Sequence, residues 1–279
     1  MTSRVLTAVV LIPPVLYVLG WGPEWLYLLV LLAVVERAWY EYVILNRHAG
    51  FTTFAALGYV ACALLCLAPA VTRLKQTEVL AFALVLLFLM VTLALALLAV
   101  PDLHHYLGTT AATFIGILYV GGTLSCLVPL RYAPHSSDGI GPGREVVLLL
   151  FIVVSVGDIL AFFSGHLVGR TPLFPRVSPK KTVEGAIGGF LGSLIAAWIF
   201  AHWFWRSADL ETVLLLAAVA AIAGQIGDLV ESAFKRGAAM KDSGALLPGH
   251  GGLLDRIDSL MFGAPALWLA LAFRDILHS

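Results

Sequence analysis

Long apolar runs occupy most of this chain and restrict what it can fold into. Each is close to the length that crosses the hydrocarbon core of a bilayer as a helix, about 20 residues. A helix also satisfies its own backbone hydrogen bonds, which lipid cannot do. We expect nine spans, at about residues 4–20, 24–45, 52–71, 78–100, 110–131, 145–168, 183–204, 211–234 and 253–273. The sequence therefore predicts an all-α, polytopic integral membrane protein with about nine transmembrane helices.

The composition excludes an ordinary water-soluble protein. Of the 279 residues, 60% are hydrophobic and 12% are charged, whereas soluble domains carry about 25% charged residues. No polar stretch is long enough for a separate soluble domain, and the basic residues are too scattered for a nucleic-acid site. We expect about five N-terminal spans within residues 1–140 and a C-terminal catalytic region, 141–279, with its site on the cytoplasmic side.

The distribution of lysine and arginine predicts this orientation. With nine spans, the N-terminus and the loops after even-numbered helices share one side of the membrane, and that side holds most of the 17 Lys and Arg residues. Cytoplasmic loops are enriched in these residues. The polar loops 169–182 and 235–252 are therefore predicted to face the cytoplasm.

The segment from Ser232 to Asp258 is dense in charge and glycine, although it lies among apolar runs. Charged side chains are costly near hydrocarbon and usually have a function there. The cations of this segment suit the binding of phosphates, and its carboxylates suit a divalent metal. These residues are Lys235, Arg236 and Lys241 for the first role, and Asp242, Asp255 and Asp258 for the second. The combination is typical of a protein that handles a polyphosphate at a membrane surface.

The same segment carries a family resemblance. It contains the elements Ser232-x-x-Lys235-Arg236, Lys241-Asp242, Pro248-x-His250-Gly251-Gly252 and Asp255-Arg256-x-Asp258. This resembles the complete signature of the phosphatidate cytidylyltransferases, or CDP-diacylglycerol synthases. A second segment, Ser178-Pro179-Lys180-Lys181-Thr182-x-Glu184-Gly185, resembles another element of that family. The chain differs from the family pattern at two places. It has Phe162 where the family usually has a tyrosine, and Arg170 near the place where the family usually has a lysine.

The resemblance implies a magnesium-dependent nucleotidyltransferase that joins CTP and phosphatidic acid at the bilayer. A second cation and a homodimer stay open, and a bacterial inner membrane with the site facing the cytoplasm is the expected location. The implied metal ligands are Asp228 and Asp255. The implied catalytic residues are Asp228, Lys235, Arg236, Lys241, Asp255, Arg256 and Asp258. The implied substrate-binding residues are Lys180, Lys181, Ser232, His250, Gly251 and Gly252.

Structural explanations compete at several of these positions. Asp228 shares a helix face with Ser232 and Lys235 through i, i+4, i+7 spacing, as a helix end reaching the headgroups would. Asp255 and Asp258 begin a helix, where the helix dipole stabilises carboxylates. Glycines 251 and 252 would serve a plain turn equally well.

The second segment has ordinary explanations too. Lys180 and Lys181 would anchor a helix start in the headgroups. Glu184 is placed to cap that helix, with Lys180 or Lys181 as a partner. Gly185, Gly188, Gly189 and Gly192 form a small-residue face of the kind that packs membrane helices closely.

The roles of three other acidic residues stay open. Asp158, inside the sixth span, is either a functional carboxylate or a buried partner of a basic residue. Glu36 and Glu41, in the second span, either line a lipid entrance or lie at the cytoplasmic helix end.

Two other functions are compatible with the residues. One is a cytidylyltransferase that acts on a different lipid phosphate, such as an isoprenoid glycerol phosphate. The other is an ion-coupled transporter, in which Asp158 and Asp228 would be coupling sites. Transporters of that kind are commonly built from internal repeats, and none is evident here.

Overall fold

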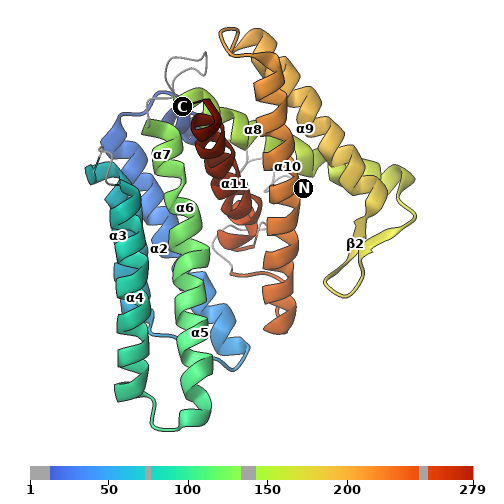
Figure 1. The fold of residues 1–279 in the computed structure, drawn as a ribbon. Helices are drawn as coiled ribbons and strands as arrows, with labels where there is room; N and C mark the ends of the chain where they lie inside the picture. The colour runs from blue at the N-terminus through green and yellow to red at the C-terminus, as the bar shows by residue number, and fades with distance from the viewer. Residues whose placement is uncertain (1–12, 73–76, 133–142, 245–250, 279) are drawn as a thin grey trace. The chain divides into compact units, whose positions relative to one another are not determined.

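A computed structural model of the protein describes residues 13–72, 77–132, 143–244 and 251–278. These residues are almost entirely helical (Figure 1). Six helices among them are long and apolar enough to cross a membrane: Val79–Ala99, Leu103–Tyr132, Gly143–Val168, Val183–Trp203, Leu210–Gly237 and Leu254–Arg274. Large apolar side chains are exposed along them, including Leu98 at 83% and Leu167 at 78%. The prediction of an all-α, polytopic membrane protein is confirmed.

The predicted number of nine spans is not confirmed. Residues 4–20, the first predicted span, lie mostly outside the described residues. The second, α2 (Glu24–His48), carries Glu36, Arg37 and Glu41 in its middle and is not among the six. The third, α3 (Ala55–Thr72), has an apolar stretch of only Ala55–Val71. The charged residues in its middle separate α2 from the six.

The remaining elements are helices, which follow the predicted runs within a few residues, and two strands. They are α4 (Thr77–Ala99), η1 (Leu103–His105), α5 (Tyr106–Gly116), η2 (Ile117–Gly122), α6 (Thr123–Ser125), α7 (Leu127–Tyr132), α8 (Gly143–Val168), β1 (Pro172–Phe174), β2 (Ser178–Thr182), α9 (Val183–Trp203), α10 (Leu210–Gly237) and α11 (Leu254–His278). The element η2 is a turn of π-helix. The strands β1 and β2 pair in an antiparallel hairpin that the sequence did not predict.

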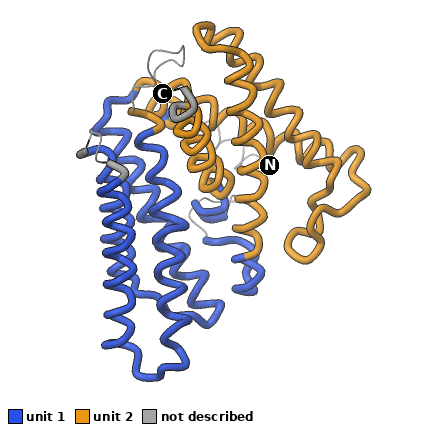
Figure 2. The backbone as a smooth tube through the Cα atoms, viewed as in Figure 1, with its two compact units in different colours: residues 1–14, 22–129, 234–256 blue, residues 15–21, 130–233, 257–279 orange. Residues whose placement is uncertain are grey.

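The chain forms two compact units (Figure 2). Unit 1 consists of residues 1–14, 22–129 and 234–256, and unit 2 of residues 15–21, 130–233 and 257–279. The division runs through α10 and α11, so the Ser232–Asp258 signature contributes to both units. The predicted separation of a catalytic region, 141–279, stays a prediction.

In unit 1, aromatic side chains attach the end of α10 to the N-terminal helices. The Phe234 ring lies 5.0 Å from the Tyr119 ring and 5.8 Å from the Tyr42 ring, centroid to centroid. Tyr42 is buried on α2 and donates a hydrogen bond from its hydroxyl to Ala112 O at 2.9 Å. A side chain at Gly116 would overlap the Tyr42 ring, so glycine makes room for this packing. The residue after Phe234 is the signature lysine, Lys235, whose backbone is thereby placed.

In unit 2, small residues bring α8 and α9 into close contact. A Cβ at Gly189 would lie 2.8 Å from Ala161 Cβ and 2.8 Å from Gly157 O. A Cβ at Gly185 would lie 2.9 Å from Ala161 O, and Ser193 Oγ donates to Val153 O at 2.8 Å. The predicted small-residue face on residues 185–192 is confirmed, because these glycines let the two backbones approach.

Candidate functional site

In unit 1 the signature residues gather around the carboxylate of Asp255, in the first turn of α11. Asp255 Oδ1 accepts a 2.6 Å hydrogen bond from Lys235 Nζ, at the end of α10. Asp255 Oδ2 accepts from two backbone donors, Ser243 N at 2.9 Å and Gly252 N at 2.8 Å, and lies 2.8 Å from Ser243 Oγ. The side chains of Lys235 and Asp255 are only 12% and 6% exposed. The carboxylate is therefore held in a fixed direction by the protein.

The glycines of the signature are needed for close approach as well as for turning. Gly251 has a φ of +78°, in the left-handed region that favours glycine. A Cβ on Gly252 would overlap Ser243 Oγ and would touch Glu41 Oε2. A side chain at residue 252 would push the backbone of that residue away from Asp255, to which its N–H group donates. His250, a predicted substrate-binding residue, lies outside the described residues.

Glu41 on α2 is the functional candidate whose role the sequence left open. It is fully buried, at 0% exposure. Its carboxylate accepts hydrogen bonds from Leu253 N and Leu254 N at 3.0 and 2.8 Å, and it pairs with Arg37 at 3.0 Å. It also lies 3.1 Å from Ser243 Oγ, whose one proton can go to Glu41 or to Asp255. The structure therefore places Glu41 beside the signature, although about 200 residues separate them in the chain.

The other signature cations of unit 1 reach the surface. Lys241 and Arg256 are exposed, and so are Asp242 and Arg236. Arg236 donates from Nη1 to Met240 O at 3.2 Å, across the turn that ends α10. Exposed guanidinium and ammonium groups beside a fixed carboxylate suit the binding of an anionic ligand.

In unit 2 the predicted metal ligand Asp228 is held less tightly. Its Oδ2 pairs with Lys181 Nζ, and the two side chains are 28% and 29% exposed. Lys180, the neighbour of Lys181 on β2, is exposed. Ser232 is buried, at 8% exposure. The sequence did not foresee that Lys181 would neutralise Asp228.

Further carboxylates lie near Asp228. Asp258 is 9% exposed and accepts a hydrogen bond on Oδ1 from its neighbour Ser259 N at 2.7 Å. Asp158, Asp228 and Glu231 are all close enough to Asp258 to interact with it electrostatically. Such a group of like charges favours a cation nearby. No three His, Cys, Asp or Glu side chains within the described ranges are arranged as a ready metal site.

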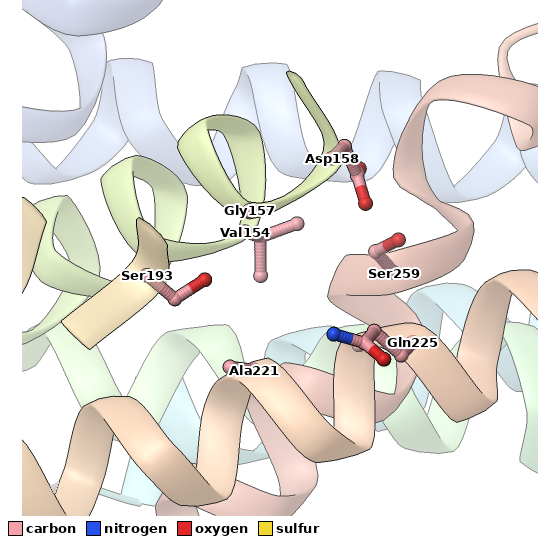
Figure 3. Close-up of a pocket in the computed structure, with 8 residues that line it drawn as sticks. Val154, Gly157, Asp158, Ser193, Ala221, Gln225 and Ser259 are labelled. Carbon is pink, nitrogen blue, oxygen red and sulfur yellow. The ribbon is translucent and has the colours of Figure 1, made fainter. Parts of the chain in front are cut away.

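A small pocket lies in the same unit (Figure 3). The polar ends of Asp158, Gln225 and Ser259 face it from α8, α10 and α11. Gln225 donates from Nε2 to Ala186 O at 3.0 Å, whereas Ser259 Oγ is buried and has no hydrogen-bond partner among the described residues. The space inside the pocket is only about 10 Å³, roughly enough for one water molecule. By itself it is too small for a nucleotide.

The role predicted for Glu184 needs a correction. The helix cap of α9 is Thr182, whose Oγ1 accepts from Gly185 N at 3.1 Å. Glu184 instead accepts hydrogen bonds from the backbone N–H groups of Arg170 and Thr171, at 3.1 and 3.2 Å. Its carboxylate thus fastens the base of the β1–β2 hairpin to α9 and does not bind Lys180 or Lys181. The sequence did not predict the β1–β2 hairpin. At its base the N–H groups of Arg170 and Thr171 point toward the start of α9, where Glu184 accepts from them.

The chain matches the model of the cytidylyltransferase family over residues 2–274. Over 129 residues, 46% of this chain and 50% of the relative, it is 45% identical to a phosphatidate cytidylyltransferase of Staphylococcus haemolyticus (strain JCSC1435). It is 42% identical, over the same extent, to a phosphatidate cytidylyltransferase of Staphylococcus aureus (strain COL). The chain spans about half the length of the curated relatives it matches.

Proposed function

This chain belongs to the cytidylyltransferase family, and from that premise we propose that it transfers CMP from CTP to phosphatidic acid. The products are CDP-diacylglycerol and pyrophosphate. The observation that carries the proposal is the cluster of signature residues around Asp255 in unit 1, with exposed cations next to a fixed carboxylate. The relatives named phosphatidate cytidylyltransferase, each matched by this chain over half of its length, support the proposal.

The reaction needs little covalent chemistry from the protein. An ionised phosphate oxygen of the lipid attacks the α-phosphorus of CTP, and a new P–O bond forms. The bond from the α-phosphorus to the oxygen that bridges it to the β-phosphate breaks, and that oxygen leaves with pyrophosphate. Both reactants are anions, so positioning and charge neutralisation are the main tasks. We assign phosphate binding to Lys235, Arg236, Lys241 and Arg256, with Lys180 and Lys181 as further candidates.

The carboxylates fit a role as magnesium ligands. Among the described residues, Asp255 Oδ1 accepts one hydrogen bond, from Lys235, and has a second lone pair for a cation. The side chain of Asp228 is 28% exposed beside Lys181, so we infer that an ion can reach it. Magnesium prefers one or two protein carboxylates together with substrate phosphates and water. When bound, it would offset negative charge on the reacting phosphates. We propose Asp228 and Asp255 as these ligands, with Asp258 in support.

The enzyme would work at the cytoplasmic face of a bacterial inner membrane. The excess of Lys and Arg on the side of loops 169–182 and 235–252 supports this orientation. CTP would arrive from the cytoplasm, and phosphatidic acid would keep its acyl chains in the bilayer.

Purified protein in phosphatidic acid vesicles, given radiolabelled CTP and Mg²⁺, tests the proposal. We expect label in CDP-diacylglycerol, and none when ATP replaces CTP. An isoprenoid glycerol phosphate supplied in place of phosphatidic acid tests the alternative lipid substrate. No labelled lipid from phosphatidic acid, with label in the isoprenoid product, would overturn the proposed substrate but keep the cytidylyl transfer.

A further inference from the structure

Glu41 connects the N-terminal helices of unit 1 with the signature, to which it does not itself belong. Each of its carboxylate oxygens has two partners. Oε1 accepts from Leu253 N at 3.0 Å and pairs with Arg37 Nη2 at 3.0 Å. Oε2 accepts from Leu254 N at 2.8 Å and lies 3.1 Å from Ser243 Oγ. A fully buried carboxylate with four partners is a fixed point in the structure.

Two of these partners are the donors that start α11. The first N–H groups of a helix have no partner within it, and a carboxylate at that end also interacts favourably with the helix dipole. Glu41 supplies that carboxylate from another helix, α2. The hydrogen bonds therefore determine at which residue α11 begins. Asp255, one residue after Leu254, takes its direction from that start.

Ser243 continues the connection to Asp255 itself. Its hydroxyl lies 3.1 Å from Glu41 Oε2 and 2.8 Å from Asp255 Oδ2, and its backbone N–H donates to Asp255 Oδ2 at 2.9 Å. Ser243 is fully buried. Glu41 and Asp255 thus share the one hydroxyl proton of Ser243, so the position of each carboxylate depends on the other.

The glycines next to Glu41 support this assignment independently. A Cβ on Gly244 would lie 2.8 Å from Glu41 Oε1, and a Cβ on Gly252 would lie 2.5 Å from Glu41 Oε2. Both are closer than real Cβ atoms approach another atom, so side chains at these positions would displace the carboxylate. The backbone at Gly244 and at Gly252 is therefore shaped around Glu41.

We propose that Glu41 is a positioning residue for Asp255 and Lys235. It fixes the start of α11 and, through Ser243, the direction in which Asp255 presents its carboxylate. Its expected effect on turnover rests on the proposed function, whereas its effect on the start of α11 does not. A purely stabilising role would let Glu41 variants that fold keep their activity.

Glu41→Gln tests this, with Glu24→Gln as the matched control. Glutamine keeps the shape, but its NH₂ group would face a backbone N–H of Leu253 or Leu254, and two donors cannot bond. Glu24 is exposed on the same helix. We expect faster amide hydrogen exchange in peptides that cover residues 251–256 and a fall in kcat of about 10²-fold, the cost of a misplacement of about 1 Å. The KM for CTP should change less than about threefold, since the exposed cations are untouched. Glu24→Gln should change none of these.

Normal kcat in folded Glu41→Gln, or unchanged exchange at residues 251–256, would overturn the proposal. Should Glu41→Gln fail to fold, Ser243→Ala serves, because it removes the shared hydroxyl and leaves Glu41 in place. We then expect a fall in kcat of about tenfold without added exchange at distant peptides, and unchanged kcat would refute the connection. If the wild type makes no CDP-diacylglycerol, the proposed function fails, and the exchange measurement still decides whether Glu41 sets the start of α11.

Discussion

Asp255 in unit 1 and Asp228 in unit 2 are both expected to bind a cation, yet the protein holds them very differently. Asp255 is bonded by Lys235, Ser243 and Gly252, and its side chain is 6% exposed. Asp228 has Lys181 beside it and is 28% exposed. Protein donors alone therefore hold the first carboxylate in its direction. The second is partly exposed and pairs with a single ammonium among the described residues.

The difference between Asp255 and Asp228 suggests two different tasks, one for a carboxylate aligned in advance and one for a carboxylate that takes up and releases an ion. A catalytic group that the fold aligns in advance costs nothing to align during the reaction. A ligand that must take up and release an ion with each cycle benefits from a weaker, partly hydrated partner. We therefore expect Asp255 to be the fixed member and Asp228 the adaptable one, and the following experiments can break or sharpen that contrast.

Removal of divalent cations should have the largest effect. Excess EDTA is expected to abolish synthesis of CDP-diacylglycerol, and added Mg²⁺ should restore it. The unfolding midpoint in detergent should move by less than about 2 °C, because protein donors rather than a metal hold Asp255. Turnover that survives EDTA would end the comparison, since neither carboxylate would then have a cation to bind.

Neutralising either carboxylate should come next. Asp228→Asn and Asp255→Asn are each expected to lower the turnover rate by roughly 10³-fold or more, since a metal supplies several kcal/mol and each 1.36 kcal/mol is tenfold. Initial rates at saturating Mg²⁺ measure this. Asp242→Asn is the control, because Asp242 is exposed and a milder defect is expected there. A near-normal rate in either variant would remove that residue from the proposed ligands.

The lysine partners should separate the two sites by stability. Lys235→Met leaves a buried carboxylate without its cation and should lower the free energy of unfolding by about 3 kcal/mol. Lys181→Met removes a partly exposed pair and should cost about 1 kcal/mol or less. Denaturant titration in detergent compares the two. Equal losses would mean that the two carboxylates are held equally firmly.

The smallest expected effect concerns the side of the membrane. Single cysteines at Thr171 and Asp242, in a background without Cys62, Cys66 and Cys126, should not react with an impermeant reagent in intact cells. Both positions are exposed. Ser243 is unsuitable for this purpose, because it is fully buried and bonded to Asp255. Reaction at either position before the cells are opened would contradict a cytoplasmic site.

The helices were predictable because a long apolar run must be kept away from water, and in lipid it can only do so as a helix. The predicted span at 183–204 matches α9 almost residue for residue, since an apolar run has nowhere else to go in lipid. The cations and carboxylates of the signature were predictable as a group for a related reason, because charge is rare in this chain and costly beside lipid.

Their partners were not predictable. Glu41 bonds Leu254 across a sequence separation of 213 residues, and nothing in a single sequence marks such a pair. Lys181 and Asp228 pair through an unforeseen hairpin, whose strands have only three and five residues. The turn of π-helix at Ile117–Gly122 was also missed. There, Gly121 approaches the backbone of Cys62, a contact between separate helices.

The bond between Glu41 and Leu254 also has a consequence for biosynthesis. A ribosome adds roughly 5–20 residues per second, so about 10 to 40 seconds pass between the synthesis of these two residues. During that interval α2 already exists and Arg37 can pair with Glu41, but the donors from Ser243, Leu253 and Leu254 have not been made. The oxygens that these donors later satisfy must then stay hydrated near the membrane surface, since an unsatisfied charged group in hydrocarbon is costly. The nascent protein would therefore complete its N-terminal bundle only when the last helix arrives, and shortened chains that stop before Ser243 should be early targets for membrane proteases.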